Sequence, residues 1–275
     1  MARPPLNHDL TGVNCIVTGA SSGIGKEIAR NLGRMGANVM MGSHDYSRGE
    51  EARLELVSDT KNQRMVFCEL DLARQVSIRQ FVGRFHEMFD RLDILIHNAA
   101  LWFPTKAESP DGFELVWAAN VLGPHLLMKL LRETLKKSAP SRVVFVSCGD
   151  AGGLDVDDTD YDRRSYSGDR SYRQSKQAVR LMAGSWSGHL AINGVSVNSC
   201  SPKGKFKTNL YRRAGGLGTM MSRLTASHPA AGADTPTYVA VSPDLGGVTG
   251  KFFVDRKQAK DKLRRQDDMH ALWHL

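Results

Sequence analysis

Short apolar runs alternate with longer amphipathic stretches along most of the chain. The runs occupy residues 13–17, 37–41, 65–70, 94–96, 143–146, 195–197 and 252–254. Between them, segments such as 24–32 and 76–89 carry apolar residues at helical spacing. Near-continuous apolar strands separated by helices are typical of a parallel sheet covered on both faces. The pattern therefore predicts a doubly wound (Rossmann) α/β fold of about seven strands, with residues 1–275 forming one dinucleotide-binding and catalytic domain.

Composition supports a soluble globular protein without a membrane span. The 275 residues are 41% hydrophobic and 24% charged, and no apolar run approaches the ~20 residues that cross a bilayer. The first residues, MARPPLNHDLTG, lack the apolar core of a signal peptide. The four cysteines have no metal-ligand spacing, so we expect no metal site. Free thiols in a reducing cytosol are favoured over disulfides, which indicates a cytoplasmic location.

The formal net charge of +8 raises the question of nucleic-acid binding. The basic residues are dispersed, with small clusters at 203–207 and 251–265. Neither cluster is interleaved with stacking aromatics, as a single-strand groove would be. We therefore expect a small-molecule substrate and no nucleic acid; the lysines of 203–207 either face solvent or favour an anionic substrate.

A glycine-rich segment, TGASSGIG, joins the first predicted strand to the first predicted helix. Glycines let the backbone approach a pyrophosphate closely, and a helix N-terminus offers free amides and a favourable dipole. The strand–loop–helix context is the one that such a motif requires. The expected cofactor-binding residues of this loop are Gly19, Ser21, Ser22, Gly23, Ile24 and Gly25.

The end of the second predicted strand bears on the choice of nicotinamide cofactor. A fold that selects NAD places a carboxylate there, on the ribose 2′-hydroxyl. Ser43 stands at this position, followed by His44 and, nearby, Arg48. The missing negative charge leaves room for a 2′-phosphate, so we expect NADP(H). A slip of one residue would bring Asp45 into play, and NAD(H) is the alternative.

Tyr172 and Lys176 are a candidate proton-transfer pair. They are four residues apart, so on a helix they lie on one face. A free tyrosine has a pKa near ~10, and a cation within a few ångströms lowers it. Such a pair can act as a general acid or base near neutral pH.

Taken together, these motifs make the chain resemble the short-chain dehydrogenases/reductases, almost from end to end. TGASSGIG is similar to the TGxxxGxG loop, Asn120 to the catalytic asparagine, and Tyr172 with Lys176 to YxxxK. The resemblance implies that Tyr172 passes a proton to a carbonyl oxygen while the nicotinamide gives hydride. It also implies that Lys176 holds the ribose hydroxyls and lowers the tyrosine pKa. Asn120 would fix a water that links Lys176 to solvent.

The same resemblance implies further contacts with the cofactor. Asp71 and Leu72 would contact adenine, and the segment around Asn98 and Ala99 resembles the family's NNAG with both ends altered. Pro202 and Thr208 resemble the segment that meets the nicotinamide amide. The chain is most similar to the retinol-dehydrogenase-like branch without its membrane anchor. A homodimer or homotetramer, built on the helices near Asn120 and Tyr172, is also implied.

One expected catalytic residue departs from the family pattern. The serine that hydrogen-bonds the substrate carbonyl aligns with Cys148, not with Ser147. Adjacent strand residues point to opposite faces, so Ser147 is no simple substitute. A thiol is a weak hydrogen-bond donor, and losing a preorganised donor raises a barrier by ~3–4 kcal/mol. Either the exchange is tolerated with modest activity or the site has moved to other chemistry.

Two loops and an aromatic pair are candidates for substrate binding. The loops span about 149–170, which holds seven aspartates, and about 202–232. Trp102 and Phe103 follow the fourth predicted strand at its carboxyl end, where such sheets bind ligands. They form either an aromatic wall for a bulky substrate or plain packing under the next helix.

The sequence leaves three function classes open. The first is an NADP(H)-dependent oxidoreductase that interconverts a carbonyl and a secondary alcohol on a fairly bulky molecule. The second is a non-redox isomerase, dehydratase or cyclase of a biosynthetic pathway on the same scaffold. The third is a nucleotide-sensing protein without turnover, which the intact set of Asn120, Tyr172 and Lys176 disfavours.

Overall fold

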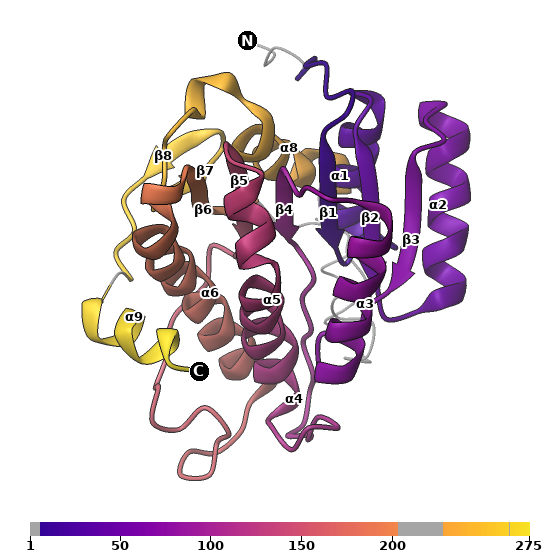
Figure 1. Cartoon of the computed structure of the whole chain (residues 1–275). Coiled ribbons are helices and arrows are strands. Elements are labelled where there is room, and N and C mark those ends of the chain that lie inside the picture. Colours follow the sequence, from indigo (N-terminus) through magenta and orange to yellow (C-terminus); the bar gives the residue numbers. More distant parts are fainter. Residues whose placement is uncertain (1–5, 203–227, 264) are drawn as a thin grey trace.

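A computed structural model of the chain describes residues 6–202, 228–263 and 265–275. Its described strands form one sheet in the order β3-β2-β1-β4-β5-β6-β7-β8 (Figure 1). The strands are β1 (Asn14–Thr18), β2 (Asn38–Ser43), β3 (Met65–Glu69), β4 (Ile94–His97), β5 (Ser141–Val146), β6 (Val195–Ser201), β7 (Phe252–Val254) and β8 (Lys257–Ala259). Neighbouring strands are parallel except for the last pair, β7 and β8.

Helices cover both faces of the sheet. One layer contains α1 (Gly23–Arg34), α2 (Tyr46–Thr60) and α8 (Pro229–Val241). The other contains α3 (Gln75–Met88), α5 (Gly123–Lys137) and α6 (Gly168–Leu190) (Figure 1). Shorter elements are α4 (Leu115–Trp117), a π-helical turn η1 (Ala118–Leu122), the 3₁₀ turns η2 (Ala191–Asn193) and η3 (Pro243–Leu245), and α9 (Gln266–Trp273).

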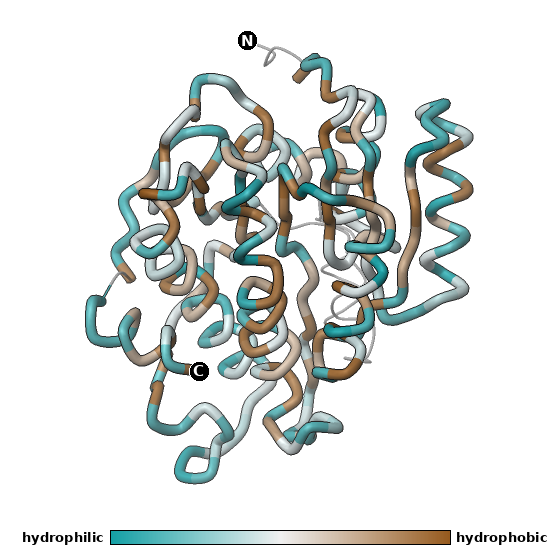
Figure 2. The backbone as a smooth tube through the Cα atoms, in the orientation of Figure 1, coloured by the Kyte–Doolittle hydropathy of each residue, from teal (hydrophilic) through white to brown (hydrophobic). Residues whose placement is uncertain are grey.

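Each central strand supplies side chains to two separate apolar cores. In β4, Leu95 belongs to the core under α3, α5 and α6, while Ile94 and Ile96 belong to the core under α1 and α8. Figure 2 shows hydrophobic residues along the strands and on the inner sides of the helices. Burial on both faces explains why these strands are near-continuous apolar runs rather than alternating ones.

The predicted doubly wound fold is confirmed, and the seven predicted strands all form. The eighth strand, β8, was not predicted because Lys257, Gln258 and Ala259 are polar or small. It folds back on β7 through Asp255 and Arg256, both with φ of 59°. Two positive φ values are typical of a tight hairpin turn, but Asp-Arg is not a sequence that predicts one. The charged side chain of Lys257 suits a sheet edge.

The C-terminal helix α9 lies on α6 (Figure 1). The Trp273 ring stacks on His189, with centroids 3.5 Å apart, and meets Trp186 edge-on at 4.8 Å. Met269 and Leu272 are buried in the same contact. In the described part of the chain, none of the helices combines the length and the apolar character that crossing a bilayer requires.

The sheet topology determines where a ligand can bind. The chain runs outward from β1 to β2 and β3 on one side, and from β4 to β5 and β6 on the other. In such a sheet the ligand crevice lies at the carboxyl ends of the strands, where the order reverses. The loops after β1, β4 and β5 therefore border the candidate site.

Candidate active site

The glycine-rich loop after β1 packs tightly against the loop after β4. Gly19 has a φ of +68°, and a Cβ on it would lie 2.7 Å from the Cα of Ala99. Helix α1 begins at Gly23, and its N-cap, Ser22, makes no side-chain capping bond. The first turn of α1 also carries no acidic residue. In the described structure, the amides at this helix start are therefore not matched by a side chain of the helix itself, which suits a phosphate.

Asn98 hydrogen-bonds to Thr18, the last residue of β1, where this loop begins. Its amide Nδ2 donates to the Thr18 carbonyl at 3.0 Å, and its backbone amide donates to Thr18 Oγ1 at 3.0 Å. The Ala99 amide donates to the same hydroxyl at 3.0 Å. Because its side chain is committed to β1, we assign Asn98 the role of holding the loop in place.

The register of β2 decides which residue stands at its carboxyl end. Ser43 pairs with Glu69 of β3 and is the last residue of the strand. Its hydroxyl donates at 2.9 Å to Ser21 Oγ. Ser21 belongs to the glycine-rich loop of residues 18–25, which we call the phosphate loop. His44 is exposed, whereas Asp45 caps α2 by accepting from the Arg48 amide at 3.0 Å. The Asp45 carboxylate, the acid that would favour NAD at this strand end, is thus used as a helix cap.

The residues expected at adenine follow β3. Asp71 is partly buried and accepts from the Ala73 amide at 2.9 Å, which shapes the turn before α3. Leu72 is buried, and its carbonyl lies where a Cβ on Gly123 would come within 2.1 Å. Both lie at the carboxyl end of β3, on the side of the sheet that carries the phosphate loop.

Tyr172 and Lys176 lie on one face of α6. The Lys176 ammonium is 5.8 Å from the centre of the Tyr172 ring. Lys176 is 3% exposed and donates to the Val146 carbonyl at 2.9 Å, at the end of β5. Burial lowers the pKa of Lys176 to about 8. The Tyr172 side chain is half-buried beside it.

Asn120 lies in the π-helical turn η1. Its Oδ1 accepts from the Leu101 amide at 2.7 Å, and its Nδ2 donates to the Leu101 carbonyl at 2.8 Å. Nδ2 also donates to Ser175 Oγ at 2.9 Å, so the side chain joins the loop after β4 to α6. Single π turns are frequent at functional sites because they displace one residue from the helix.

Ser147 and Cys148 directly follow β5, and their side chains have different surroundings. Ser147 is buried, and its hydroxyl donates to the Lys176 carbonyl at 2.7 Å. It also accepts from Arg180 Nε at 3.2 Å, so it is committed to α6. Cys148 is partly exposed. Burial raises the pKa of its thiol, while the charges of Lys176 and Arg180 oppose that rise. Cys148 is therefore the residue at this strand end whose side chain is available to a substrate.

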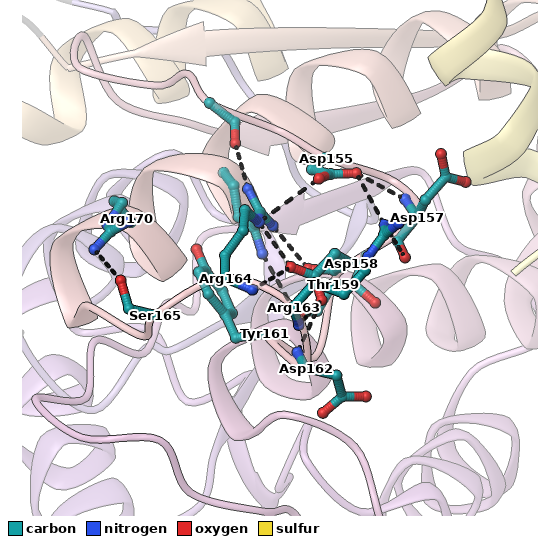
Figure 3. A network of polar contacts seen from close by, with 12 residues as sticks. Asp155, Asp157, Asp158, Thr159, Tyr161, Asp162, Arg163, Arg164, Ser165 and Arg170 are labelled. Atoms are coloured by element: carbon teal, nitrogen blue, oxygen red, sulfur yellow. Dashed lines mark hydrogen bonds and ion pairs between the residues drawn. The ribbon is translucent and has the colours of Figure 1, made fainter.

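The acidic loop between β5 and α6 is organised by one buried carboxylate (Figure 3). Asp158 accepts from the backbone amides of Asp162, Arg163 and Arg164 at 2.8–3.1 Å. Arg164 Nε donates to it at 2.8 Å and holds the pKa of Asp158 at about 2. Arg164 also donates to Gln174 Oε1 of α6 at 3.0 Å. The loop is thereby fastened to the helix that carries Tyr172.

Of the remaining predicted residues, Trp102 and Phe103 lie beneath the start of α6. The Trp102 indole donates to Asp169 Oδ1 at 2.9 Å, and the residue is 9% exposed. The Phe103 carbonyl accepts from the Tyr166 hydroxyl at 3.1 Å. These contacts favour the packing role for Trp102. Pro202 is partly buried directly after β6, and Thr208 lies outside the described residues.

Glu114 is a buried residue of the site that the sequence did not single out. Its carboxylate caps α4 by accepting from the Val116 and Trp117 amides at 3.0 and 2.7 Å. It also accepts from Ser171 Oγ at 3.1 Å, one residue before Tyr172. Burial raises the pKa of Glu114 despite these bonds. Glu114 thus connects the helix of Asn120 to the helix of Tyr172.

We expect Glu114→Ala to lower the free energy of unfolding by about 2–3 kcal/mol, because a cap is lost and buried donors lose their acceptor. Urea denaturation measures this change. Glu133→Ala is the matched control, since Glu133 is exposed on α5 and pairs there with Arg132 and Lys136; we expect a change within about 0.5 kcal/mol. Equal effects of the two substitutions would contradict the bridging role.

Comparison with known proteins agrees with this geometry. The family model described as short chain dehydrogenase matches residues 14–215, which include the phosphate loop, Asn120, Tyr172 and Lys176. The chain belongs to the short-chain dehydrogenase family. Retinol dehydrogenase 13 of Homo sapiens is 36% identical, with 98% of this chain and 85% of the relative covered. Polyprenol dehydrogenase of Mus musculus is 35% identical, with 98% and 84% covered.

Solved structures give the same result for the fold. An uncharacterized protein from Mycobacterium paratuberculosis superposes with a TM-score of 0.78 at 26% identity, covering 98% of this chain and 93% of that one. The chain is therefore a member of a family of oxidoreductases. The predicted similarity to the retinol-dehydrogenase-like branch is confirmed by the relatives.

Proposed function

We propose that the protein is an NADP(H)-dependent oxidoreductase that interconverts a carbonyl and a secondary alcohol on a fairly bulky small molecule. The observation that carries the proposal is the buried Lys176 beside Tyr172, at the end of β5. A buried ammonium is costly, and at this position it has a chemical use. It favours the phenolate form of Tyr172 and so makes proton exchange with an alcohol feasible.

The described residues fit a nicotinamide dinucleotide. The α1 amides and the phosphate loop would hold the pyrophosphate, and Lys176 would hold ribose hydroxyls near the end of β5. Asp71 and Leu72 would border adenine, and Pro202 would meet the nicotinamide, as would Thr208, which lies outside the described residues. When bound, the cofactor supplies or accepts the hydride.

The chain's own residues then manage the proton and the orientation of the substrate. Tyr172 gives its hydroxyl proton to the carbonyl oxygen during reduction and takes it back during oxidation. Cys148 offers a weak S–H hydrogen bond to the same oxygen. Asn120 maintains the π turn and, through Ser175, its contact with α6.

The cofactor preference gives a testable prediction at Ser43. Ser43→Asp is expected to weaken NADPH binding at least tenfold relative to NADH, because a carboxylate repels a 2′-phosphate and accepts from a 2′-hydroxyl. Fluorescence titration with both nucleotides measures the ratio. His44→Ala, at the exposed neighbouring residue, is expected to weaken NADPH without improving NADH. Tighter binding of NADH by the unchanged protein would overturn the NADP(H) preference.

Cys148→Ser distinguishes the proposal from the non-redox alternative. If carbonyl reduction is the natural reaction, we expect the reductase rate to change by less than about tenfold, because the site is already adapted to a thiol. A gain of about 10²–10³-fold, the value of a restored donor, would favour an isomerase, dehydratase or cyclase. Initial rates with the best carbonyl substrate measure the difference.

The function itself is tested by nicotinamide absorbance with a panel of bulky carbonyls and alcohols. Retinol and polyprenol belong in the panel, since two relatives are named for them. The expected result is oxidation of NADPH that depends on a carbonyl of the panel, or reduction of NADP⁺ that depends on an alcohol. Tight binding of NADPH without turnover of any compound would contradict the proposal.

We also propose that the protein is a homodimer or homotetramer that uses α5 and α6. Helix α9 covers part of α6 through Trp273, so an interface on these helices must include α9 or the exposed part of α5. Light scattering after gel filtration gives the mass, and a monomer at all concentrations would contradict this proposal.

A further inference from the structure

Arg180 is a nearly buried cation on the same face of α6 as Tyr172 and Lys176. It follows Lys176 by one turn and is 8% exposed. Its guanidinium reaches the end of β5, where Nε donates to Ser147 Oγ at 3.2 Å and a terminal nitrogen donates to the Cys148 carbonyl. A buried charge without partners would be strongly destabilising. We therefore expect the guanidinium to have specific partners on every side.

The other side of the guanidinium is held by the C-terminal part of the chain. It lies 4.0 Å from the centre of the Phe252 ring of β7, and it pairs with Asp261 Oδ1 at 3.6 Å. The planar group thus has a stacking partner, a carboxylate and two acceptors directly after β5. These contacts fix the guanidinium itself, so it can in turn fix what it binds.

The segment that it binds, Ser147 and Cys148, directly follows β5. Strand β5 ends at Val146, and the Ser147 amide makes the last contact with β6, donating to the Cys200 carbonyl at 2.8 Å. The Cys148 carbonyl comes after this ladder has ended and would need another donor. Arg180 supplies that donor, and the hydroxyl of Ser147 joins Arg180 to the Lys176 carbonyl.

We propose that Arg180 is a positioning residue for the reaction: by holding Ser147 and the Cys148 carbonyl, it fixes the Cys148 thiol beside Lys176. The described charged groups that act on this thiol are Lys176 and Arg180 from α6 and Asp150 from the following loop. Burial opposes the thiolate, as does the Asp150 charge, while the two cations and a hydrogen bond from the Asp150 amide favour it. The kinetic consequence of the proposal rests on the proposed function, whereas the placement of the thiol does not.

The first experiment measures the thiol without any turnover. The alkylation of Cys148 by iodoacetamide is followed against pH, with mass spectrometry to separate it from the partly exposed Cys68. In Arg180→Met we expect the midpoint for Cys148 to rise and its limiting alkylation rate to change at least threefold, because both a charge and an anchor are lost. Arg180→Lys keeps the charge but loses the several fixed donors of the guanidinium. The midpoint pH of Cys148 alkylation is therefore expected to stay near that of the unchanged protein.

A partly buried arginine provides the control. Arg142 lies at the other end of β5 and donates to the Ser242 carbonyl at 2.6 Å. Arg142→Met is expected to lower stability without altering the Cys148 profile. An unchanged profile in folded Arg180→Met, or an equal change in Arg142→Met, would overturn the proposal. If Arg180→Met does not fold, an unchanged limiting rate in Arg180→Lys overturns it instead.

The kinetic experiment compares kcat/KM with NADPH affinity. Displacing a reacting group by about 1 Å costs up to a hundredfold in rate, so we expect kcat/KM of Arg180→Lys to fall between about tenfold and a hundredfold. The Kd for NADPH is expected to stay within about threefold, since the phosphate loop is not touched. A rate loss matched by an equal loss of NADPH affinity would contradict the positioning role. If the unchanged protein turns over no carbonyl, the proposed function fails while the alkylation result still decides the role of Arg180.

Discussion

Replacing Tyr172 with Phe is expected to lower kcat for carbonyl reduction by about 10²–10⁴-fold, the contribution of a positioned general acid. The ring remains and continues to pack beside Lys176, so only the transferable proton is removed. The Kd for NADPH is expected to be nearly unchanged. Steady-state kinetics and a fluorescence titration on the same preparation separate the two effects.

Tyr161 offers a matched control for this substitution. It is a buried tyrosine in the loop before α6, and its hydroxyl has no hydrogen-bond partner within the described structure. Burial raises the pKa of Tyr161 to about 12, so its hydroxyl is no acid or base near neutral pH. Tyr161→Phe is expected to leave kcat unchanged. A Tyr172→Phe protein with more than a tenth of the original rate would contradict the assignment of Tyr172.

The fold was largely predictable because its determinants are local. Burial on both faces makes each central strand an apolar run, and this signal is visible in a few residues, as in Ile94, Leu95 and Ile96. The hairpin strand β8 gives no such signal, because it lies at a sheet edge and one of its three residues is a lysine. Its formation depends on pairing with β7, which follows from tertiary structure.

The same distinction applies to the candidate site. The spacing of Tyr172 and Lys176 specifies a shared helix face, and the structure places the ammonium and the ring accordingly. In contrast, Glu114 and Arg180 act through partners 57 and 32 residues away in the chain. Charged side chains are commonly solvated, whether they lie inside a helix, as Arg180 does, or just before one, as Glu114 does, so nothing local distinguished these two. Only the packing of α4 and β5 against α6 reveals them.

Lys176 connects the proposed chemistry to the stability of the protein. Burial lowers its pKa to about 8, from an ordinary value of 10.5. Below pH 8 the side chain is charged in both the folded and the unfolded chain, and the folded state bears the full cost of burying the charge. Between pH 8 and 10.5 only the folded state loses its proton, so this cost disappears as the pH rises. At about 1.4 kcal/mol per pKa unit, it amounts to about 3 kcal/mol.

Lys176→Met is therefore expected to increase the free energy of unfolding of the cofactor-free protein at pH 7 by about 2 kcal/mol. This gain is the relieved cost of burial less the hydrogen bond to Val146 that is lost, worth about 1 kcal/mol. The gain should shrink above pH 8 and reverse near about pH 10, where the remaining cost falls below the value of the lost hydrogen bond, while reductase activity is lost at every pH. Urea denaturation at pH 7 and pH 10 measures the trend.

An exposed lysine shows whether the trend belongs to the buried site. Lys257 lies on the edge strand β8, and Lys257→Met is expected to change stability by less than about 0.5 kcal/mol at both pH values. If Lys176→Met is less stable than the unchanged protein at pH 7, the ammonium does not strain the fold. Greater stability with lost activity would instead show that the fold bears the cost of a buried charge because the reaction requires it beside Tyr172.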